Sequence, residues 1–135
     1  MTFSVPTVLL LTHAPDHPST AKGLQFAKDF YQHWQGESPV ALKIFLYSDA
    51  VMLANRLSWR PADMPNPAHD WQQFAQQHDI TLQVCVSASL ARGVTDADNA
   101  KRHGLQGDNL ANHCELMGLG ELAIHLHHSE RLVQF

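Results

Sequence analysis

Positive charge is scarce and scattered in this sequence. Nine Lys and Arg stand against 13 Asp and Glu, the formal net charge is -4, and no more than two basic residues adjoin anywhere. A nucleic-acid-binding face needs clustered basic side chains that neutralise phosphates. The sequence therefore argues against direct contact with nucleic acid, and its negative charge is compatible with protein partners.

Long apolar runs and cysteines are also few. The N-terminal apolar stretch VPTVLLL has seven residues and no Lys or Arg before Lys22, a pattern that fits neither a signal peptide nor a membrane span. We therefore expect a cytoplasmic protein. Because thiols stay reduced there, Cys85 and Cys114 are interpreted as two separate thiols and not as a structural disulfide.

The chain alternates between strand and helix signals. At 135 residues and 44% hydrophobic content, it suffices for one domain, residues 1–135, and is too short for two ordinary ones. Apolar runs predict strands at residues 4–12, 40–47, 80–88, 112–118 and 131–135. Apolar residues three or four apart predict helices at residues 19–36, 48–57, 70–78, 89–105 (broken by a turn) and 118–129. This order predicts an α/β fold, with a mostly parallel sheet of about five strands covered by helices on both faces.

Polar and Gly/Pro residues mark the element ends. Ser19 is the expected N-cap of the first helix, and Gly36 with Pro39 is expected to stop it. Residues 58–70, with three prolines, are expected to form an irregular loop that is functional or faces a partner.

Cys85 lies where the third strand signal fades, before helix formers resume at Leu90. In parallel α/β sheets, ligands bind beyond the carboxyl ends of the strands. A thiolate beside the first turn of a helix also faces unpaired N–H groups, which favours the ionised, nucleophilic form. The alternative is a cysteine that packs as a small hydrophobe. Residue statistics favour packing and the position favours chemistry, so both interpretations stay open at this point.

Several familiar cysteine chemistries do not fit the spacing. A phosphatase or rhodanese loop separates Cys and Arg by five residues, whereas six lie between Cys85 and Arg92, and no glycine precedes Gly93 to allow the tight wrap. A thioredoxin-like C-x-x-C motif is absent, because Cys114 lies 29 positions downstream. A cysteine hydrolase needs an oriented His, but with ten His in the chain any match carries little information.

Two C-terminal patterns imitate ligand sites. Gly118, Gly120 and Ala123 fit the dinucleotide pattern G-x-G-x-x-A, but only twelve residues follow and the expected acidic partner has no place, so close helix packing by glycine is the better account. His125 and His128 have a spacing that suits metal ligands, without further ligands nearby. We expect an exposed helix end there and no metal.

Residues 82–94, LQVCVSASLARGV, resemble the cysteine segment of the DsrE/TusD family of sulfur-relay proteins. The segments GLQFAKDF, IFLYSDAVMLANRL, DWQQFAQQHDITLQVCV, GLGELA and ERLVQF resemble the TusD branch of that family in the same order. The resemblance covers nearly the whole chain. It is weaker in the proline-rich loop after Trp59 and in the His-rich segments HCELMG and HLHH.

The resemblance implies a three-layer α/β/α domain in which Cys85 carries sulfur as a persulfide, without a cofactor. It implies a sulfur donor similar to TusA, an acceptor similar to TusE, and a heterohexamer with two copies each of this chain and of related subunits similar to TusB and TusC. The end use would be synthesis of 2-thiouridine at the wobble position of tRNA. Because DsrE proteins of the same family act in sulfur oxidation, the pathway stays open.

Residues near Cys85 are candidates for supporting roles. Ser87 and Ser89 can donate hydrogen bonds to a persulfide, Arg92 can supply positive charge, and Asn55 would line the site if the second helix begins beside the third strand. For Ser87, helix capping is the stronger alternative. We interpret Cys114 as a packing residue and not as a resolving thiol.

The sequence is compatible with three classes of function: a sulfur carrier, a non-catalytic subunit of an assembly, and a small-ligand-binding domain. An interface would use exposed apolar side chains, for which the sequence offers Trp59, Met64, Val133 and Phe135. A reactive Cys85 would separate the first class from the other two.

Overall fold

The computed structural model describes residues 3–37 and 41–135, and its centre is a five-stranded sheet in which every pairing is parallel. The strands lie in the order β4-β3-β2-β1-β5. Their bounds are β1 (Thr7–Leu11), β2 (Leu42–Leu46), β3 (Leu82–Cys85), β4 (Cys114–Met117) and β5 (Arg131–Gln134). The predicted strands and their parallel arrangement are confirmed.

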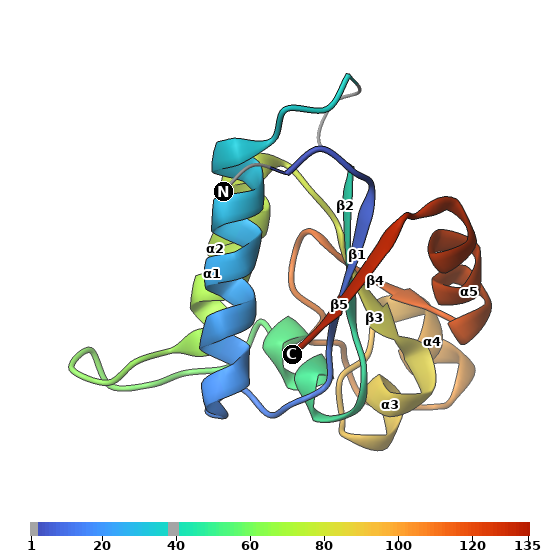
Figure 1. The fold of residues 1–135 in the computed structure, drawn as a ribbon. Coiled ribbons are helices and arrows are strands. Elements are labelled where there is room, and N and C mark those ends of the chain that lie inside the picture. The colour runs from blue at the N-terminus through green and yellow to red at the C-terminus, as the bar shows by residue number, and fades with distance from the viewer. Residues whose placement is uncertain (1–2, 38–40) are drawn as a thin grey trace.

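Helices cover both faces of this sheet. They are α1 (Pro18–His33), the 3₁₀ helix η1 (Ser48–Ala54), α2 (Pro67–His78), α3 (Val86–Ala91), α4 (Ala97–Arg102) and α5 (Leu119–His128). Figure 1 shows α1 and α2 on one side of the sheet, and α3, α4 and α5 on the other. The three-layer α/β/α architecture is thereby confirmed.

The core lies between the central strands and the α1–α2 layer. Alternate side chains of β1 point to α1: a Cβ added at Gly23 of α1 would come within 2.6 Å of the Leu11 side chain. The largest wholly buried side chains include Phe30 of α1 and both Trp71 and Phe74 of α2. Burial of a phenylalanine side chain stabilises the fold by about 1.5–3 kcal/mol relative to exposure. The apolar helix faces predicted from the sequence therefore anchor α1 and α2 to the sheet.

The first helix begins one residue before its predicted cap. His17, not Ser19, is the N-cap, and its Nδ1 accepts a hydrogen bond of 3.1 Å from the Ser19 N–H. Pro18 fills the first helical position, where its fixed φ suits the helix and its missing N–H costs nothing. The predicted stop at Pro39 and the first residue of the predicted second strand, Val40, lie outside the described residues.

Other element ends also differ from the prediction. The predicted helix at residues 48–57 is the 3₁₀ helix η1, entered through Ser48 at a φ of 55°. α2 begins at Pro67, three residues early, because Asn66 caps it by accepting from the His69 N–H. β3 ends at Cys85 and α3 follows at once, so the predicted restart of helix near Leu90 was too late.

One packing prediction at the C-terminal end is wrong. A Cβ added at Gly118 or Gly120 would meet nothing within 4 Å, so neither glycine is needed for close packing. Val133 and Phe135 are half-buried against the core, so part of their apolar surface already packs within the chain. Their use in an interface stays a prediction.

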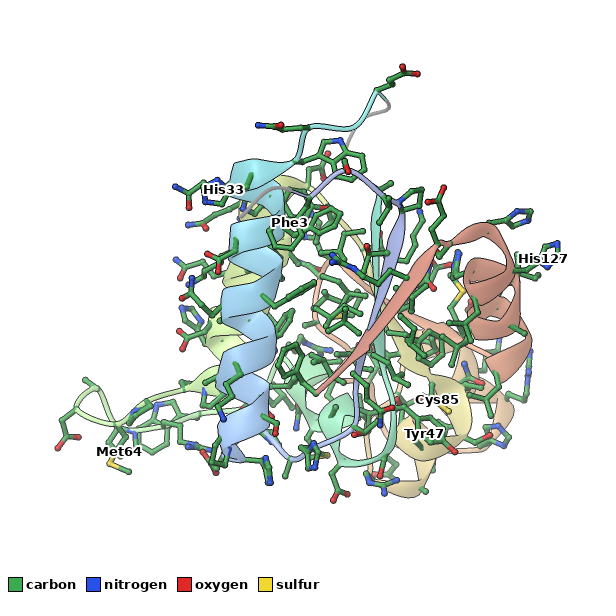
Figure 2. The ribbon with its side chains drawn as sticks, in the orientation of Figure 1. Phe3, His33, Tyr47, Met64, Cys85 and His127 are labelled. Atoms are coloured by element: carbon green, nitrogen blue, oxygen red, sulfur yellow. The ribbon has the colours of Figure 1, made fainter. Side chains whose placement is uncertain are left out.

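The proline-rich loop before α2 projects from the body of the molecule, and Figure 2 places Met64 at its far end. Trp59 is 79% exposed there and Met64 is 53% exposed. Arg60 ties the loop to Asp16 through two hydrogen bonds of 2.8 and 2.9 Å. In the part of the chain that the structure describes, no helix is both long enough and apolar enough to cross a membrane.

Candidate functional site: the cavity beside Cys85

Cys85 lies at the junction of β3 and α3, at the carboxyl edge of the sheet. It is the last residue of the strand and the N-cap of the helix, with φ −59° and ψ 120°, and its side chain makes no capping hydrogen bond. The residue is only 3% exposed. A reagent can therefore reach the thiol only through an opening between the surrounding side chains.

Such an opening exists as a cavity of about 320 Å³ beside the thiol. Its walls come from the carboxyl ends of β2, β3 and β4, from α3 and its C-cap, and from the start of α5. The lining residues are Tyr47, Ser48, Cys85, Val86, Ser87, Ala88, Arg92, Gly118 and Leu119. Figure 2 shows Tyr47 and Cys85 next to one another at this end of the sheet. A cavity of this size is at the lower end of the range for small-molecule pockets.

Strand register places the cavity between neighbouring strands. Phe45 pairs with Gln83 and Leu46 with Val84, so the next position brings Tyr47 opposite Cys85. On the other side of β3, Cys85 pairs with Met117. Side chains in register share one face of a sheet. The site is therefore a product of sheet pairing between segments that are far apart in the sequence.

Arg92 reaches the cavity but its charge is already paired. Its Nε donates a hydrogen bond of 2.9 Å to Oδ1 of Asp49, and its Nη1 donates one of 3.2 Å to the Ala88 carbonyl. Both side chains are partly exposed, so the pair itself adds little stability. Its effect is to fix the guanidinium at the edge of the Cys85 site.

The other candidate residues divide into one that lines the cavity and two that do not. Ser87 is exposed and lines it. Ser89 is wholly buried, and its Oγ has no hydrogen-bond partner in the described part of the chain. Asn55 accepts a hydrogen bond from the Leu57 N–H through its side chain. Because η1 and not a longer helix follows β2, the structure does not bring Asn55 to the cavity.

Sequence reasoning missed the four lining residues that lie outside the Cys85 segment: Tyr47, Ser48, Gly118 and Leu119. Tyr47 and Gly118 directly follow β2 and β4, the two strands that flank β3. The signal was therefore present, because the last residue of each predicted strand and the residue after it fall at the carboxyl edge. It was unusable without the strand order.

Cys114 occupies a different environment from Cys85. It is the first residue of β4, opposite Leu82, three positions before the Met117 that pairs with Cys85. Both cysteines are free thiols. Burial raises the pKa of the Cys114 thiol to about 12, so it stays protonated at neutral pH. Its surroundings fit packing and not nucleophilic chemistry.

Metal ligands do not cluster in the described residues, which contain no group of three or more His, Cys, Asp or Glu side chains able to hold an ion. His127 and His128 are exposed near the end of α5. His125 is half-buried, and burial together with the nearby Lys43 lowers its pKa.

The sequence matches the model of the DsrE/DsrF-like family over residues 7–135. The chain belongs to this family. It is 41% identical to "Sulfurtransferase TusD" of Serratia proteamaculans over 118 residues, 85% of this chain and 92% of the relative. It is 34% identical to "Sulfurtransferase TusD homolog" of Vibrio cholerae over 131 residues, 96% of this chain and 97% of the relative. The crystal structure of the ychN protein from E. coli, 21% identical, aligns over the full length of both chains with a TM-score of 0.74, which shows the shared fold.

Proposed function

We propose that this protein is a sulfurtransferase that carries sulfane sulfur as a persulfide on Cys85. The observation that carries the proposal is the position of Cys85, at the carboxyl edge of the sheet and open to a cavity, in a chain 41% identical to a sulfurtransferase. Cys114 does not compete for this role, because its raised pKa leaves almost no thiolate near neutral pH.

The transfer consists of two thiol exchanges. In the first, the Cys85 thiolate attacks the outer sulfur of a donor persulfide; the donor S–S bond breaks and the donor leaves as a thiolate. In the second, an acceptor thiolate attacks the outer sulfur on Cys85, and Cys85 leaves as a thiolate with the bonding electron pair. Each step forms one S–S bond and breaks one, so neither requires a redox cofactor or a metal.

The resemblance to the TusD branch supports a specific place for this reaction. The donor is a protein similar to TusA and the acceptor a protein similar to TusE, and the sulfur ends in 2-thiouridine at the wobble position of tRNA in the cytoplasm. The chain acts within a heterohexamer with subunits similar to TusB and TusC. The negative charge supports the assignment of any tRNA contact to another component. The exposed Trp59 and Met64 of the projecting loop are the side chains that fit a subunit contact.

Intact mass after brief incubation with a small persulfide donor tests the carrier role. The wild type is expected to gain one sulfur, about 32 daltons, that a reductant removes, and Cys85→Ser is expected to gain none. Cys114→Ser is the matched control and is expected to load like the wild type. Equal loss in both variants would contradict the single-cysteine mechanism.

A second candidate function is a non-catalytic subunit that supports an assembly, and the exposed apolar loop is the observation that favours it. A non-catalytic subunit is expected to carry no sulfur on Cys85, either as the isolated chain or in its assembled complex. Substitution of Trp59 is then expected to prevent assembly. A sulfur carrier for sulfur oxidation would load Cys85 in the same way, and is distinguished by which acceptor protein removes the sulfur.

A further inference from the structure

Tyr47 lines the same cavity as Cys85, the proposed sulfur carrier. The two thiol exchanges proposed above do not involve its side chain. It follows β2 directly, and its backbone stays extended, with φ −133° and ψ 157°. Its N–H still donates to the Leu11 carbonyl of β1, at 2.9 Å. The strand conformation therefore continues through Tyr47, and the alternation of side chains between the two faces continues with it.

That alternation puts Tyr47 and Cys85 on the same face. The pairs Phe45–Gln83 and Leu46–Val84 make Tyr47 and Cys85 the next neighbours across β2 and β3. Adjacent strands are about 4.8 Å apart, and a tyrosine side chain is longer than that spacing. Both residues line the same cavity, and Figure 2 shows their side chains together.

The Tyr47 hydroxyl is available for a ligand. In residues 3–37 and 41–135, no hydrogen bond, ion pair or ring contact engages its side chain, and the residue is 38% exposed. Arg92, the one cation among the described lining residues, is held by Asp49. Among the described lining residues, Tyr47 thus offers a hydroxyl beside Cys85 whose hydrogen no protein acceptor binds.

We propose that, when Cys85 releases its sulfur and becomes a thiolate, the Tyr47 hydroxyl turns to donate a hydrogen bond to Sγ and stabilises that charge. This inference rests on the proposed function. As the acceptor thiolate attacks the outer sulfur, the bond between that sulfur and Sγ breaks and its electron pair moves onto Sγ. The hydroxyl then faces a full negative charge. A hydrogen bond to a charged group is about twice as strong as one between neutral groups, so the interaction favours departure of the sulfur.

The pH profile of Cys85 alkylation by iodoacetamide tests this role without any sulfur donor. Tyr47→Phe keeps the ring and removes only the hydroxyl. Its profile is expected to have a midpoint higher by about one pH unit than that of the wild type, with no fall in the rate at high pH. Tyr47→Leu, which lacks ring and hydroxyl, is expected to show the same midpoint shift.

Tyr31→Phe is the matched control, because Tyr31 is the only other tyrosine and lies in α1, against the Phe74 and His78 rings. Its profile is expected to follow the wild type. A Tyr47→Phe profile that coincides with the wild type, or an equal shift in Tyr31→Phe, overturns the inference.

Discharge of loaded sulfur to a small thiol provides the second measurement. Near neutral pH, Tyr47→Phe is expected to release sulfur about tenfold more slowly than the wild type, and Tyr31→Phe at the wild-type rate. If the wild type gains no sulfur, the proposed function fails while the alkylation result still decides the role of Tyr47. If the wild type loads and both Tyr47→Phe measurements match it, the role of Tyr47 alone fails.

Discussion

The guanidinium Nε of Arg92 lies 2.9 Å from Oδ1 of Asp49, across 43 positions of sequence. The pair joins the end of α3 to the first turn of η1, and Arg92 also lines the Cys85 cavity. The electrostatic potential at the thiol therefore depends on two opposite charges and not on Arg92 alone.

This pairing predicts how the site discriminates between charged and neutral reagents. Asp49→Asn leaves the guanidinium charge uncompensated, so the rate of Cys85 alkylation by anionic iodoacetate, relative to neutral iodoacetamide, is expected to rise about threefold. Arg92→Gln is expected to lower that ratio by a similar factor. High salt is the control, because both differences are expected to shrink as the charges are screened. Ratios unchanged in both variants would show that the pair does not act on the thiol.

The two thiols are predicted to differ in reactivity. At about pH 8, iodoacetamide is expected to modify Cys85 in the folded protein and to leave Cys114 unmodified, because burial raises the pKa of Cys114 to about 12. Peptide mass spectrometry of the alkylated protein locates the label. Both cysteines are expected to react when the protein is first unfolded in denaturant. Rapid labelling of Cys114 in the native state is the contrary outcome.

Cys114 is also predicted to weaken the fold at alkaline pH. Its pKa is about 12 when folded and near 9.0 in the unfolded chain, so above about pH 9 the unfolded state gains from ionisation and the folded state does not. The free energy of unfolding keeps its full value below about pH 9. Above that pH it falls by up to about 1.4 kcal/mol per pH unit, until the pH exceeds the pKa of Cys114 in the folded protein. Cys114→Ala removes this loss.

Urea unfolding near pH 8 and near pH 10.5 gives the change in the free energy of unfolding between the two conditions, and this change is compared between the wild type and Cys114→Ala. The wild type is expected to lose more free energy of unfolding between the two conditions than Cys114→Ala does. Parallel losses in the two proteins would contradict the assignment, since Tyr31, the other group with a strongly raised pKa, is present in both.

Two glycine substitutions are predicted to change stability in opposite directions. Gly23→Ala places its Cβ 2.6 Å from the buried Leu11 side chain and is expected to lower the free energy of unfolding by about 1–3 kcal/mol. Gly120→Ala in α5 meets nothing within 4 Å and is expected to raise it by about 0.4–1 kcal/mol. Thermal or urea unfolding of the two variants measures both. A stabilised Gly23→Ala protein would show that α1 can move away from β1.

The fold was predictable because its signals are local and strong. Runs of Val, Leu and Ile predicted β1, β2, β3 and β5, and the buried Trp71 and Phe74 lie on the helix face that their spacing indicated. Element ends were less predictable. His17 displaced Ser19 as a cap because Pro18 suits the first helical position, a choice between neighbouring residues that differ little in free energy.

The candidate site was predictable only within the segment around Cys85, where Ser87 and Arg92 also line the cavity. The sequence placed this thiol near the end of a strand, and the structure confirms that position. Ser89 lies within four positions of Cys85 yet is turned into the protein interior, whereas Tyr47 lies 38 positions away and shares the cavity. Distance along the sequence was therefore a poor guide to which side chains surround the sulfur.

By itself the sequence determined the alternation of strands and helices, the parallel sheet and the cysteine at the carboxyl end of a strand, because hydrophobic periodicity and residue type act over a few positions. Only the tertiary structure decided what faces that cysteine. The order β4-β3-β2-β1-β5 sets β2 and β4 on either side of β3, and this pairing brings Tyr47, Gly118 and Leu119 to the Cys85 cavity. Strand order depends on how whole layers pack, and no local segment encodes it.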